Sequence, residues 1–257
     1  MPPADDAMLT ISLIGIGCGD PDQLTLQAVR AINAADLVLI PRKGAEKSDL
    51  AELRRAICAQ VLTNPATHIA EFDLPVRDSE REDYRSGVDD WHDAVAAAWA
   101  REIATHLGGT GRVAFLIWGD PSLYDSSLRV ARRFEPIPTI EVIPGVTAIQ
   151  ALCAAHAIPL NEIGESFLVT TGRRLREGGW PSGAETVVVM LDGGTAFRAL
   201  DPKGIRIWWG AYLGMPNQTI LSGPLTEVGS AIVAARAEAR AKHGWIMDSY
   251  ILKRALI

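Results

Sequence analysis

The pattern of hydrophobic and polar positions at the start of the chain alternates between short buried strands and amphipathic helices. Residues 9–14 form an apolar, β-branched run that ends at a glycine cluster, which is typical of a buried strand. Apolar residues at helical spacing follow up to Asn33, and residues 36–40 predict a second strand that Pro41 stops. The pattern therefore predicts a strand–helix–strand unit.

A charged segment at residues 77–90 lacks regular periodicity and predicts an exposed loop. The spacing after it predicts a long helix that ends at Gly108 and carries a large apolar residue at every fourth position. This stripe predicts core packing, and lining of a ligand pocket is the alternative. It consists of Trp91, Val95, Trp99, Ile103 and Leu107.

The chain then continues to alternate between strands and helices. Strands are predicted at residues 112–118 and 139–143, and helices at residues 122–134 and 146–156. Such alternation indicates a largely parallel sheet with helices on its faces.

The pattern changes in the second half, where strands predicted at residues 166–171, 186–191 and 206–212 have fewer helices between them. An alanine-rich stretch at residues 231–241 predicts a surface helix. The change of pattern indicates a second domain.

The length of 257 residues and the hydrophobic content of 48% allow a large buried core. Together with the change of pattern, they predict an α/β protein of two α/β domains. The N-terminal domain, with the glycine-rich loops, covers residues 1–160, and the C-terminal domain covers residues 161–257.

Charge and cysteine content exclude several classes of protein. A net charge of −6 argues against a nucleic-acid binder, which needs many cations to neutralise phosphates. Cys18, Cys58 and Cys153 are odd in number and far apart, which favours reduced thiols and shows no zinc spacing. No run approaches the roughly 20 apolar residues of a membrane span. We therefore expect a cytoplasmic protein that binds neither nucleic acid, nor a membrane, nor a metal.

Three glycine-containing turns follow predicted strands. The sequence reads GIGCGDP at residues 15–21, WGDPSLY at residues 118–124 and IPGVTA at residues 143–148. Ligands of open α/β sheets bind outside the carboxyl ends of the strands, so we expect these turns to converge on one crevice. The alternative is that the glycines only make tight turns and that Asp120 or Ser122 caps a helix.

The first turn departs from the dinucleotide-binding fingerprint. Asp20 stands where that fingerprint has its third glycine, and Ile40 and Pro41 stand where an acidic residue closes its second strand. NAD is therefore disfavoured as the ligand.

Taken together, the segments GIGCGDPDQLT, GDPSLY and IPGVTAIQA resemble the tetrapyrrole methylase family. The resemblance continues through ETVVVMLDG at residues 185–193 and GAYLGMPNQTI at residues 210–220, and it covers nearly the whole chain. It implies S-adenosylmethionine bound between two α/β domains, a small-molecule tetrapyrrole substrate and a homodimer.

Two segments, WGDPSLYDS and the closing HGWIMDSYILKR, are similar to the branch of the family that methylates precorrin-5 at C-1 and releases acetate. The closing segment departs from the common family ending, an apolar strand with glycine. The alternatives are a precorrin methyltransferase for a different ring carbon, an enzyme that methylates ribosomal RNA or a modified histidine, and a non-catalytic tetrapyrrole-binding protein.

The resemblance also implies the residues that contact the cofactor. Apolar side chains would enclose the adenine, and the carboxylate of Asp120 would attract the cationic groups. The implied contacts are Gly17, Trp118, Gly119, Asp120, Leu123, Tyr124, Thr147, Ala148, Met190, Leu191, Ala211, Tyr212 and Pro224.

Methyl transfer from a sulfonium needs alignment and a dry site rather than a nucleophilic side chain. Release of acetate would also require water to attack an acetyl carbonyl, and a general base would help. Each candidate can instead be a helix cap, a surface charge or a core residue. The candidate bases are Asp20, Asp125, Asp248 and His243, and Tyr124 and Tyr250 are candidate hydrogen-bond partners of the macrocycle.

A precorrin carries many carboxylates, so we expect cations along its binding site. Arg42 and Lys43 follow the second strand, and Arg173, Arg174 and Arg176 follow the first strand of the second domain. Simple surface solvation is the alternative for both clusters.

Overall fold

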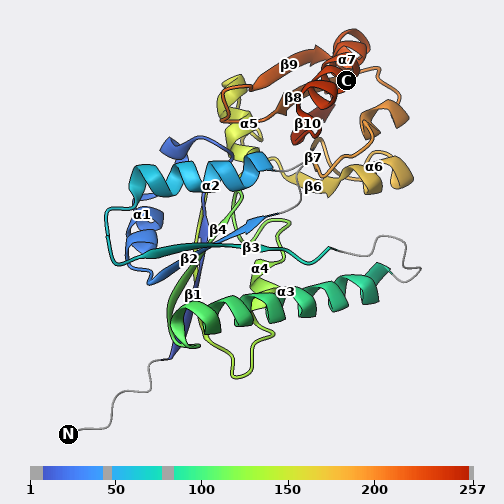
Figure 1. Ribbon diagram of the computed structural model, residues 1–257. Coiled ribbons are helices and arrows are strands. Elements are labelled where there is room, and N and C mark those ends of the chain that lie inside the picture. Colours follow the sequence, from blue (N-terminus) through green and yellow to red (C-terminus); the bar gives the residue numbers. More distant parts are fainter. Residues whose placement is uncertain (1–7, 43–47, 77–83, 255–257) are drawn as a thin grey trace, which may run out of the picture. The chain divides into compact units, whose positions relative to one another are not determined.

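The computed structural model describes residues 8–42, 48–76 and 84–254. The chain divides into two compact units, residues 1–146 and residues 147–257, each built around its own sheet (Figure 1). Within the described ranges, no helix combines the length and the apolar character needed to cross a membrane.

The first unit is a parallel sheet with the strand order β3-β2-β4-β1-β5. Every pairing in it is parallel, as the alternation of strands and helices predicts. The strands are β1 (Leu9–Gly15), β2 (Leu37–Arg42), β3 (His68–Asp73), β4 (Gly111–Ile117) and β5 (Thr139–Ile143).

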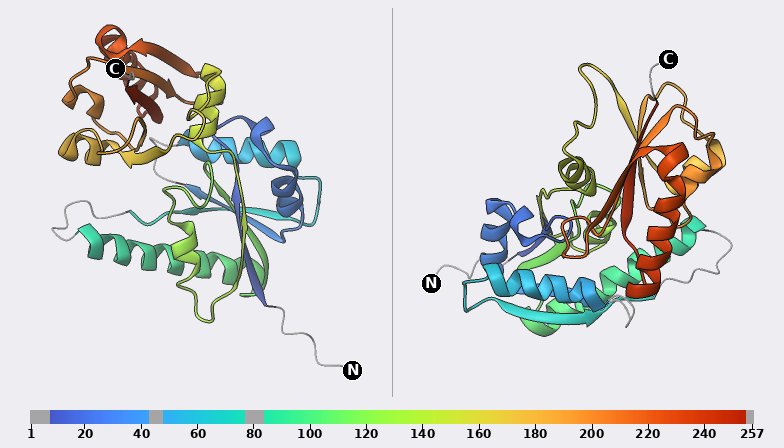
Figure 2. Two further views of the ribbon diagram at one scale, coloured as in Figure 1. Left: turned by 180° about the vertical axis from the view of Figure 1, so that it is seen from behind. Right: turned by 90° about the horizontal axis from the view of Figure 1, so that it is seen from above.

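Helices cover both faces of this sheet (Figures 1 and 2). Side chains along β1 alternate between the faces: Ile11 and Leu13 pack with α3 and α4, and Ile14 packs with α1 and α2. Each face is therefore a buried hydrophobic layer. The helical segments are η1 (Pro21–Gln23), α1 (Leu26–Asn33), α2 (Ser48–Val61), α3 (Tyr84–Leu107) and α4 (Ser127–Ala131).

Several boundaries in this unit differ from the sequence prediction. Helix α3 begins at Tyr84, so the part of the predicted loop that lies in described residues is helical. Strand β2 continues through Pro41, which pairs with β3 only and needs no N–H on its other side. The helix predicted at 122–134 is only the short α4, because a turn occupies residues 121–126. Helix α2 and strand β3 were not predicted.

The tryptophan stripe of α3 packs into the core, as predicted. Val95, Trp99 and Ile103 are buried, and the Trp99 ring stacks on Phe115 of β4 with 3.8 Å between ring centroids. Core packing is therefore confirmed for this face of the helix.

The second unit contains a mixed sheet with the order β6-β7-β10-β8-β9. β6 and β7 are parallel, whereas β10 runs antiparallel to both of its neighbours. β9 and the central strand β10 were not predicted from the sequence. The strands are β6 (Phe167–Thr171), β7 (Thr186–Met190), β8 (Ile205–Ala211), β9 (Thr219–Pro224) and β10 (Asp248–Arg254).

Helices α5 (Ala148–His156) and α7 (Leu225–His243) pack on the two faces of this sheet (Figure 2). Leu152 of α5 closes over Gly210, where an added methyl group would lie 2.8 Å from its side chain. α7 is longer than the predicted surface helix and buries Arg236. The unit also contains α6 (Gly172–Gly178) and η3 (Ala196–Ala199). The division of the chain falls before α5, whereas the sequence places the boundary after it.

Candidate active site

The three glycine turns meet at the carboxyl edge of the first sheet. β4, β1 and β5 are parallel neighbours, so the turns that follow them leave the sheet at the same edge. The N–H of Gly119 donates to the carbonyl of Gly17 at 2.8 Å, and the N–H of Gly17 donates back to Gly119 at 3.3 Å. The predicted convergence of the turns is confirmed.

Gly15 and Gly145 allow these turns to approach each other at backbone distance. A methyl group added to Gly145 would lie 2.2 Å from the carbonyl oxygen of Gly119, and one added to Gly15 would lie 2.6 Å from the nitrogen of Gly145. No side chain fits at either position. The glycines therefore pack one turn against another, in addition to shaping each turn.

Asp120 fastens the second turn to the third. Its Oδ2 accepts a hydrogen bond of 2.9 Å from the N–H of Gly145, and its Oδ1 accepts from the N–H and the hydroxyl of Ser122. Burial alone would raise the pKa of Asp120, but these hydrogen bonds outweigh it and lower the pKa. Asp120 caps no helix, because α4 begins only at Ser127.

Tyr124 closes the second turn in a strained conformation. Its φ is +52°, a region that bulky residues rarely adopt, and its side chain is 45% exposed. Trp118 is half-buried at the start of the same turn, and the N–H of Leu123 donates to the carbonyl of Asp120. A strained aromatic residue held at the surface is a feature of ligand-binding positions.

The first turn holds Asp20 and Cys18 in structural roles. The Asp20 carboxylate accepts the N–H of Asp22 as the N-cap of η1, and the N–H of Cys18 donates to Oε1 of Gln23. Burial raises the pKa of the Cys18 thiol to about 12, so at neutral pH it is a protonated thiol. Cys18 therefore presents no thiolate to a ligand.

Two predicted cofactor residues lie beyond the ends of β7 and β8 in the second unit. These strands end at the same sheet edge, since both are antiparallel to β10 between them. Leu191 has a φ of +52° and is 63% exposed, and Tyr212 has a φ of +51° and is buried with its hydroxyl bonded to the carbonyl of Trp245. Leu191 thus presents an apolar side chain, whereas Tyr212 is buried and its N–H donates to the carbonyl of Met247. Met190 and Ala211 precede them as the last residues of their strands.

Pro224 does not join this group. It pairs with Arg206 near the start of β8, at the opposite end of the strand from Ala211. Thr147 and Ala148 begin α5, where the Thr147 hydroxyl caps the helix by accepting the N–H of Ile149.

Asp248 belongs to a buried polar network that the sequence did not reveal. Its carboxylate accepts two hydrogen bonds from Arg236, at 2.7 and 3.0 Å, and one from the indole N–H of Trp209 at 2.7 Å. Arg236 also donates to the backbone carbonyl of Asp192. Asp248 is fully engaged in this network, and it is not a free general base.

The Asp192 carboxylate, in the loop after β7, extends the network to Tyr250 of β10. It accepts from the Tyr250 hydroxyl at 2.7 Å and from the N–H groups of Gly194 and Ala196. Burial and the neighbouring Asp192 charge raise the pKa of Tyr250, so this phenol stays protonated as a donor. Nothing local in the sequence marks these partners, which come from α7, β8 and β10.

The predicted substrate-binding cations have different surroundings. Arg42 pairs with Asp73 at 3.0 Å, and Lys43 lies outside the described residues. Arg173 and Arg174 are exposed on the first turn of α6, whereas Arg176 approaches Asp192 at 3.3 Å. All four described arginines of this set are exposed, and Arg173 and Arg174 lie at the edge where β6 ends.

A cavity of about 240 Å³ opens in the first unit beside the second turn. Its lining includes Asp125, one of the candidate bases, and Arg54 of α2. The rest of the cavity wall is aromatic and aliphatic, and its aromatic members are Phe72, Trp91, Trp99, Phe115 and Trp118. The remaining candidate base, His243, lies in the second unit and packs edge-on against Tyr212.

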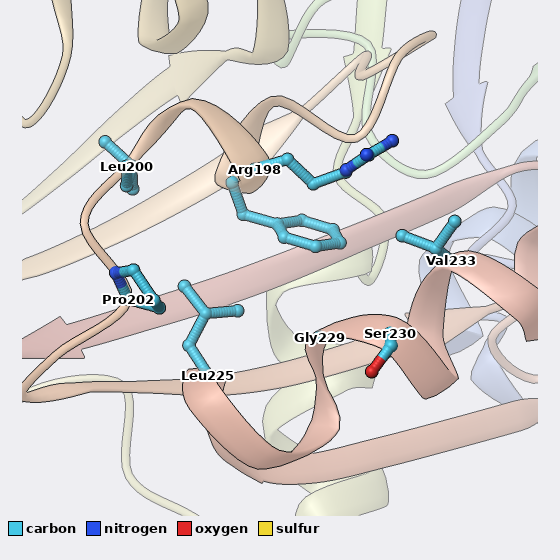
Figure 3. A pocket seen from close by; sticks show the side chains of 8 residues that line it. Arg198, Leu200, Pro202, Leu225, Gly229, Ser230 and Val233 are labelled. Carbon is cyan, nitrogen blue, oxygen red and sulfur yellow. The ribbon is translucent and has the colours of Figure 1, made fainter.

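A second hollow lies on the second unit between η3 and α7 (Figure 3). The side chains of Leu225 and Val233 rise from α7 toward the loop that carries Leu200 and Pro202, and Arg198 is the charged residue of its lining. None of the predicted site residues lines it.

Comparisons with known proteins agree with this architecture. Residues 10–229 match the family of tetrapyrrole (corrin/porphyrin) methylases. The precorrin-6A synthase (deacetylating) of a Sinorhizobium species is 46% identical over 98% of this chain and 97% of its own length.

Solved structures share the fold. A cobalamin synthesis related protein from Corynebacterium diphtheriae superposes with a TM-score of 0.82 at 39% identity, over 96% of this chain and 99% of its own. The uroporphyrin-III C-methyl transferase from Thermus thermophilus, complexed with S-adenosylhomocysteine, has a TM-score of 0.57 at 21% identity and supports the fold alone, over 95% of this chain and 97% of that one. The glycine turns, the paired sheets and these full-length matches establish that this chain belongs to the tetrapyrrole methylase family.

Proposed function

We propose that this protein methylates precorrin-5 at C-1 with S-adenosylmethionine as the donor, releasing acetate to give precorrin-6A. The observation that carries the proposal is the 46% identity to a precorrin-6A synthase along nearly the full length of both chains. The match of residues 10–229 to the tetrapyrrole methylases and the intact turns WGDPSLY and IPGVTA support it, because they favour a cofactor-using enzyme over a protein whose cofactor pocket has decayed.

The residues at the two strand edges fit S-adenosylmethionine. Asp120 supplies an ionised carboxylate that still has acceptor capacity beyond its three hydrogen bonds, which suits a cationic group. Leu191 supplies an exposed apolar side chain, which suits an adenine face. When bound, S-adenosylmethionine supplies a methyl group on a positively charged sulfur.

The residues of this chain would bind and orient the reactants. The paired hydrogen bonds between Gly17 and Gly119 would hold the first two turns at fixed positions for the cofactor. Arg173 and Arg174 would attract the carboxylates of a precorrin. No nucleophilic side chain takes part in methyl transfer itself.

A homodimer and a cytoplasmic location also belong to this proposal. The homodimer rests on the family resemblance, and the location rests on the reduced thiols. Light scattering of the purified protein checks the homodimer. A mass of one chain would overturn it.

The experiment that tests the proposed function offers several purified precorrins to the protein with radiolabelled S-adenosylmethionine. We expect label in precorrin-5 and background label in the others. Label in a different precorrin would reassign the ring carbon, whereas cofactor binding without transfer to any of them would favour a binding protein.

A further inference from the structure

The cavity beside the second turn combines an apolar wall with unpaired hydrogen-bonding capacity. Trp99 lines it and is buried, and its indole N–H has no hydrogen-bond partner among the described residues. A buried donor without a partner carries a free-energy cost of about 1–3 kcal/mol. Protein atoms enclose the Nε1 atom, so this donor belongs to the core beside the cavity, and the charged residues of the lining supply the groups that a ligand can reach.

Arg54 places a fixed positive charge in the same cavity. Its Nε donates to the carbonyl of Leu116 and its Nη1 donates to the carbonyl of Leu50, at 2.8 and 3.0 Å, and neither bond uses Nη2. Burial lowers the pKa of Arg54 to about 10, with the Asp125 charge opposing that shift, so the guanidinium remains charged at neutral pH.

Asp125 faces Arg54 without closing on it. Its Oδ1 accepts the N–H of Ser127 at 2.6 Å, a bond that leaves Oδ2 unused. Both charged groups line the cavity, and the Asp125 charge acts on Arg54, but no ion pair within 4.0 Å is found between these two described residues. A cationic and an anionic group on the wall of one cavity suit a neutral polar group and a water molecule better than they suit a second carboxylate.

The size of the cavity limits what enters it. Its volume of about 240 Å³ is below the range of about 300–1,000 Å³ for pockets that hold a whole ligand. It is several times the ~30 Å³ share of a water molecule in the liquid. A substituent of the macrocycle, with a water molecule beside it, therefore fits better than the macrocycle itself.

We propose that this cavity is the acyl subsite of the reaction, in which Arg54 binds the carbonyl oxygen of the acetyl group and Asp125 is the general base that activates water. The inference rests on the proposed function. It selects one base from the candidates, because Asp125 lines this cavity, whereas Asp20, Asp248 and His243 do not.

The step balances with water as the co-reactant. Asp125 takes a proton from water as the water oxygen bonds to the acyl carbon, and the carbonyl oxygen becomes an oxyanion held by Arg54. The bond between the acyl carbon and the ring carbon then breaks, and its electron pair stays with the macrocycle. The fragment leaves as acetic acid, which ionises in solvent, and Asp125 returns its proton to solvent.

The test compares Asp125→Asn and Arg54→Gln with the unmodified protein, on precorrin-5 and S-adenosylmethionine. We expect acetate release to fall by about 10²-fold or more in Asp125→Asn and by about 10²-fold in Arg54→Gln, which removes the positive charge. Asp125→Glu should recover part of the rate with a shifted pH profile. Asp201→Asn, at an exposed loop position of the second unit, is the matched control and should keep the full rate.

Two readouts separate this inference from the proposed function and from a folding defect. Calorimetric affinity for S-adenosylmethionine should match the unmodified protein in Asp125→Asn, Asp125→Glu and Arg54→Gln, and their thermal unfolding should remain cooperative. Acetate formed in oxygen-18 water should carry one labelled oxygen. Full acetate release by Asp125→Asn, or acetate without the label, would overturn the acyl subsite. No acetate from the unmodified protein would instead overturn the proposed function.

Discussion

The backbone N–H of Gly145 donates a 2.9 Å hydrogen bond to Oδ2 of Asp120, and so joins the turn after β5 to the turn after β4. The same carboxylate accepts two further bonds from Ser122 within its own turn. Asp120 therefore holds the two loops in register, and any contribution to cofactor binding includes this positioning role.

Replacing Asp120 by alanine should reduce both stability and cofactor affinity. The change leaves the Gly145 N–H without its partner, and an unsatisfied donor of this kind costs about 1–3 kcal/mol. Calorimetry with S-adenosylmethionine and thermal unfolding measure the two effects. Unchanged affinity would remove Asp120 from the cofactor site.

The contribution of Asp120 should depend on pH only in acid. Because its folded-state pKa is lowered, the stabilisation is present above the ordinary pKa of an aspartate and is lost as pH falls through the lowered value. The stability difference between the unmodified protein and Asp120→Asn should therefore hold through neutral pH and shrink in acid. Denaturant titrations across this range measure it, and a difference that grew as pH fell would contradict the assignment.

Gly145→Ala should disrupt the junction of the three turns. The new methyl group would lie 2.2 Å from the carbonyl oxygen of Gly119, so backbone must move, at a cost of about 1–3 kcal/mol. Gly178→Ala is the matched control, since an added methyl meets nothing within 4 Å there, and its stability should change by less than about 1 kcal/mol. Urea unfolding compares them, and equal midpoints would refute the packing role.

Breaking the Arg236–Asp248 pair should act on folding rather than on chemistry. Asp248→Asn leaves a buried guanidinium without its counter-charge, which costs about 3–5 kcal/mol. Arg236→Met together with Asp248→Asn should recover part of that loss. Chemical denaturation gives the values. A stable Asp248→Asn protein that had lost turnover would restore Asp248 as a candidate base.

The thiol of Cys18 should be unreactive in the native protein. Burial raises its pKa from 9.0 to about 12, so its contribution to stability is complete below about pH 9 and is lost as pH rises toward 12. Cys18→Ala should flatten this alkaline decline, and a thiol reagent at pH 8 should modify Cys18 only as fast as the unit opens. Rapid labelling of the folded protein would contradict the burial of this thiol.

Local chemistry accounts for what the sequence predicted. The glycine turns and the buried strands before them are encoded by adjacent residues, so both the parallel sheet and the meeting of the turns at one edge could be expected from the chain alone. Tyr124 and Leu191 were expected at the site by resemblance. Their positive φ angles add a physical reason for holding them there.

The surroundings of several candidate site residues depend on distant partners and could not be predicted from the sequence. In the sequence, Asp248 has no neighbouring residue that marks it as paired, and only the packing of α7 brings Arg236 against it. The position of Pro224 depends on the antiparallel pairing of β9 with β8, which places Pro224 beside Arg206 and Thr219 beside Ala211. The acyl subsite is similar in this respect, because Arg54 and Trp99 reach the cavity from helices on opposite faces of the sheet.

The most direct test of the proposed function measures methyl transfer and acetate release in the same reaction, by mass spectrometry of precorrin-5 incubated with isotopically labelled S-adenosylmethionine and the purified protein. We predict that each macrocycle that gains a labelled methyl group also loses its acetyl group, with acetate and methyl incorporation in equal amounts. Methylated product that retained the acetyl group, or precorrin-5 that stayed unchanged while the cofactor bound, would contradict it.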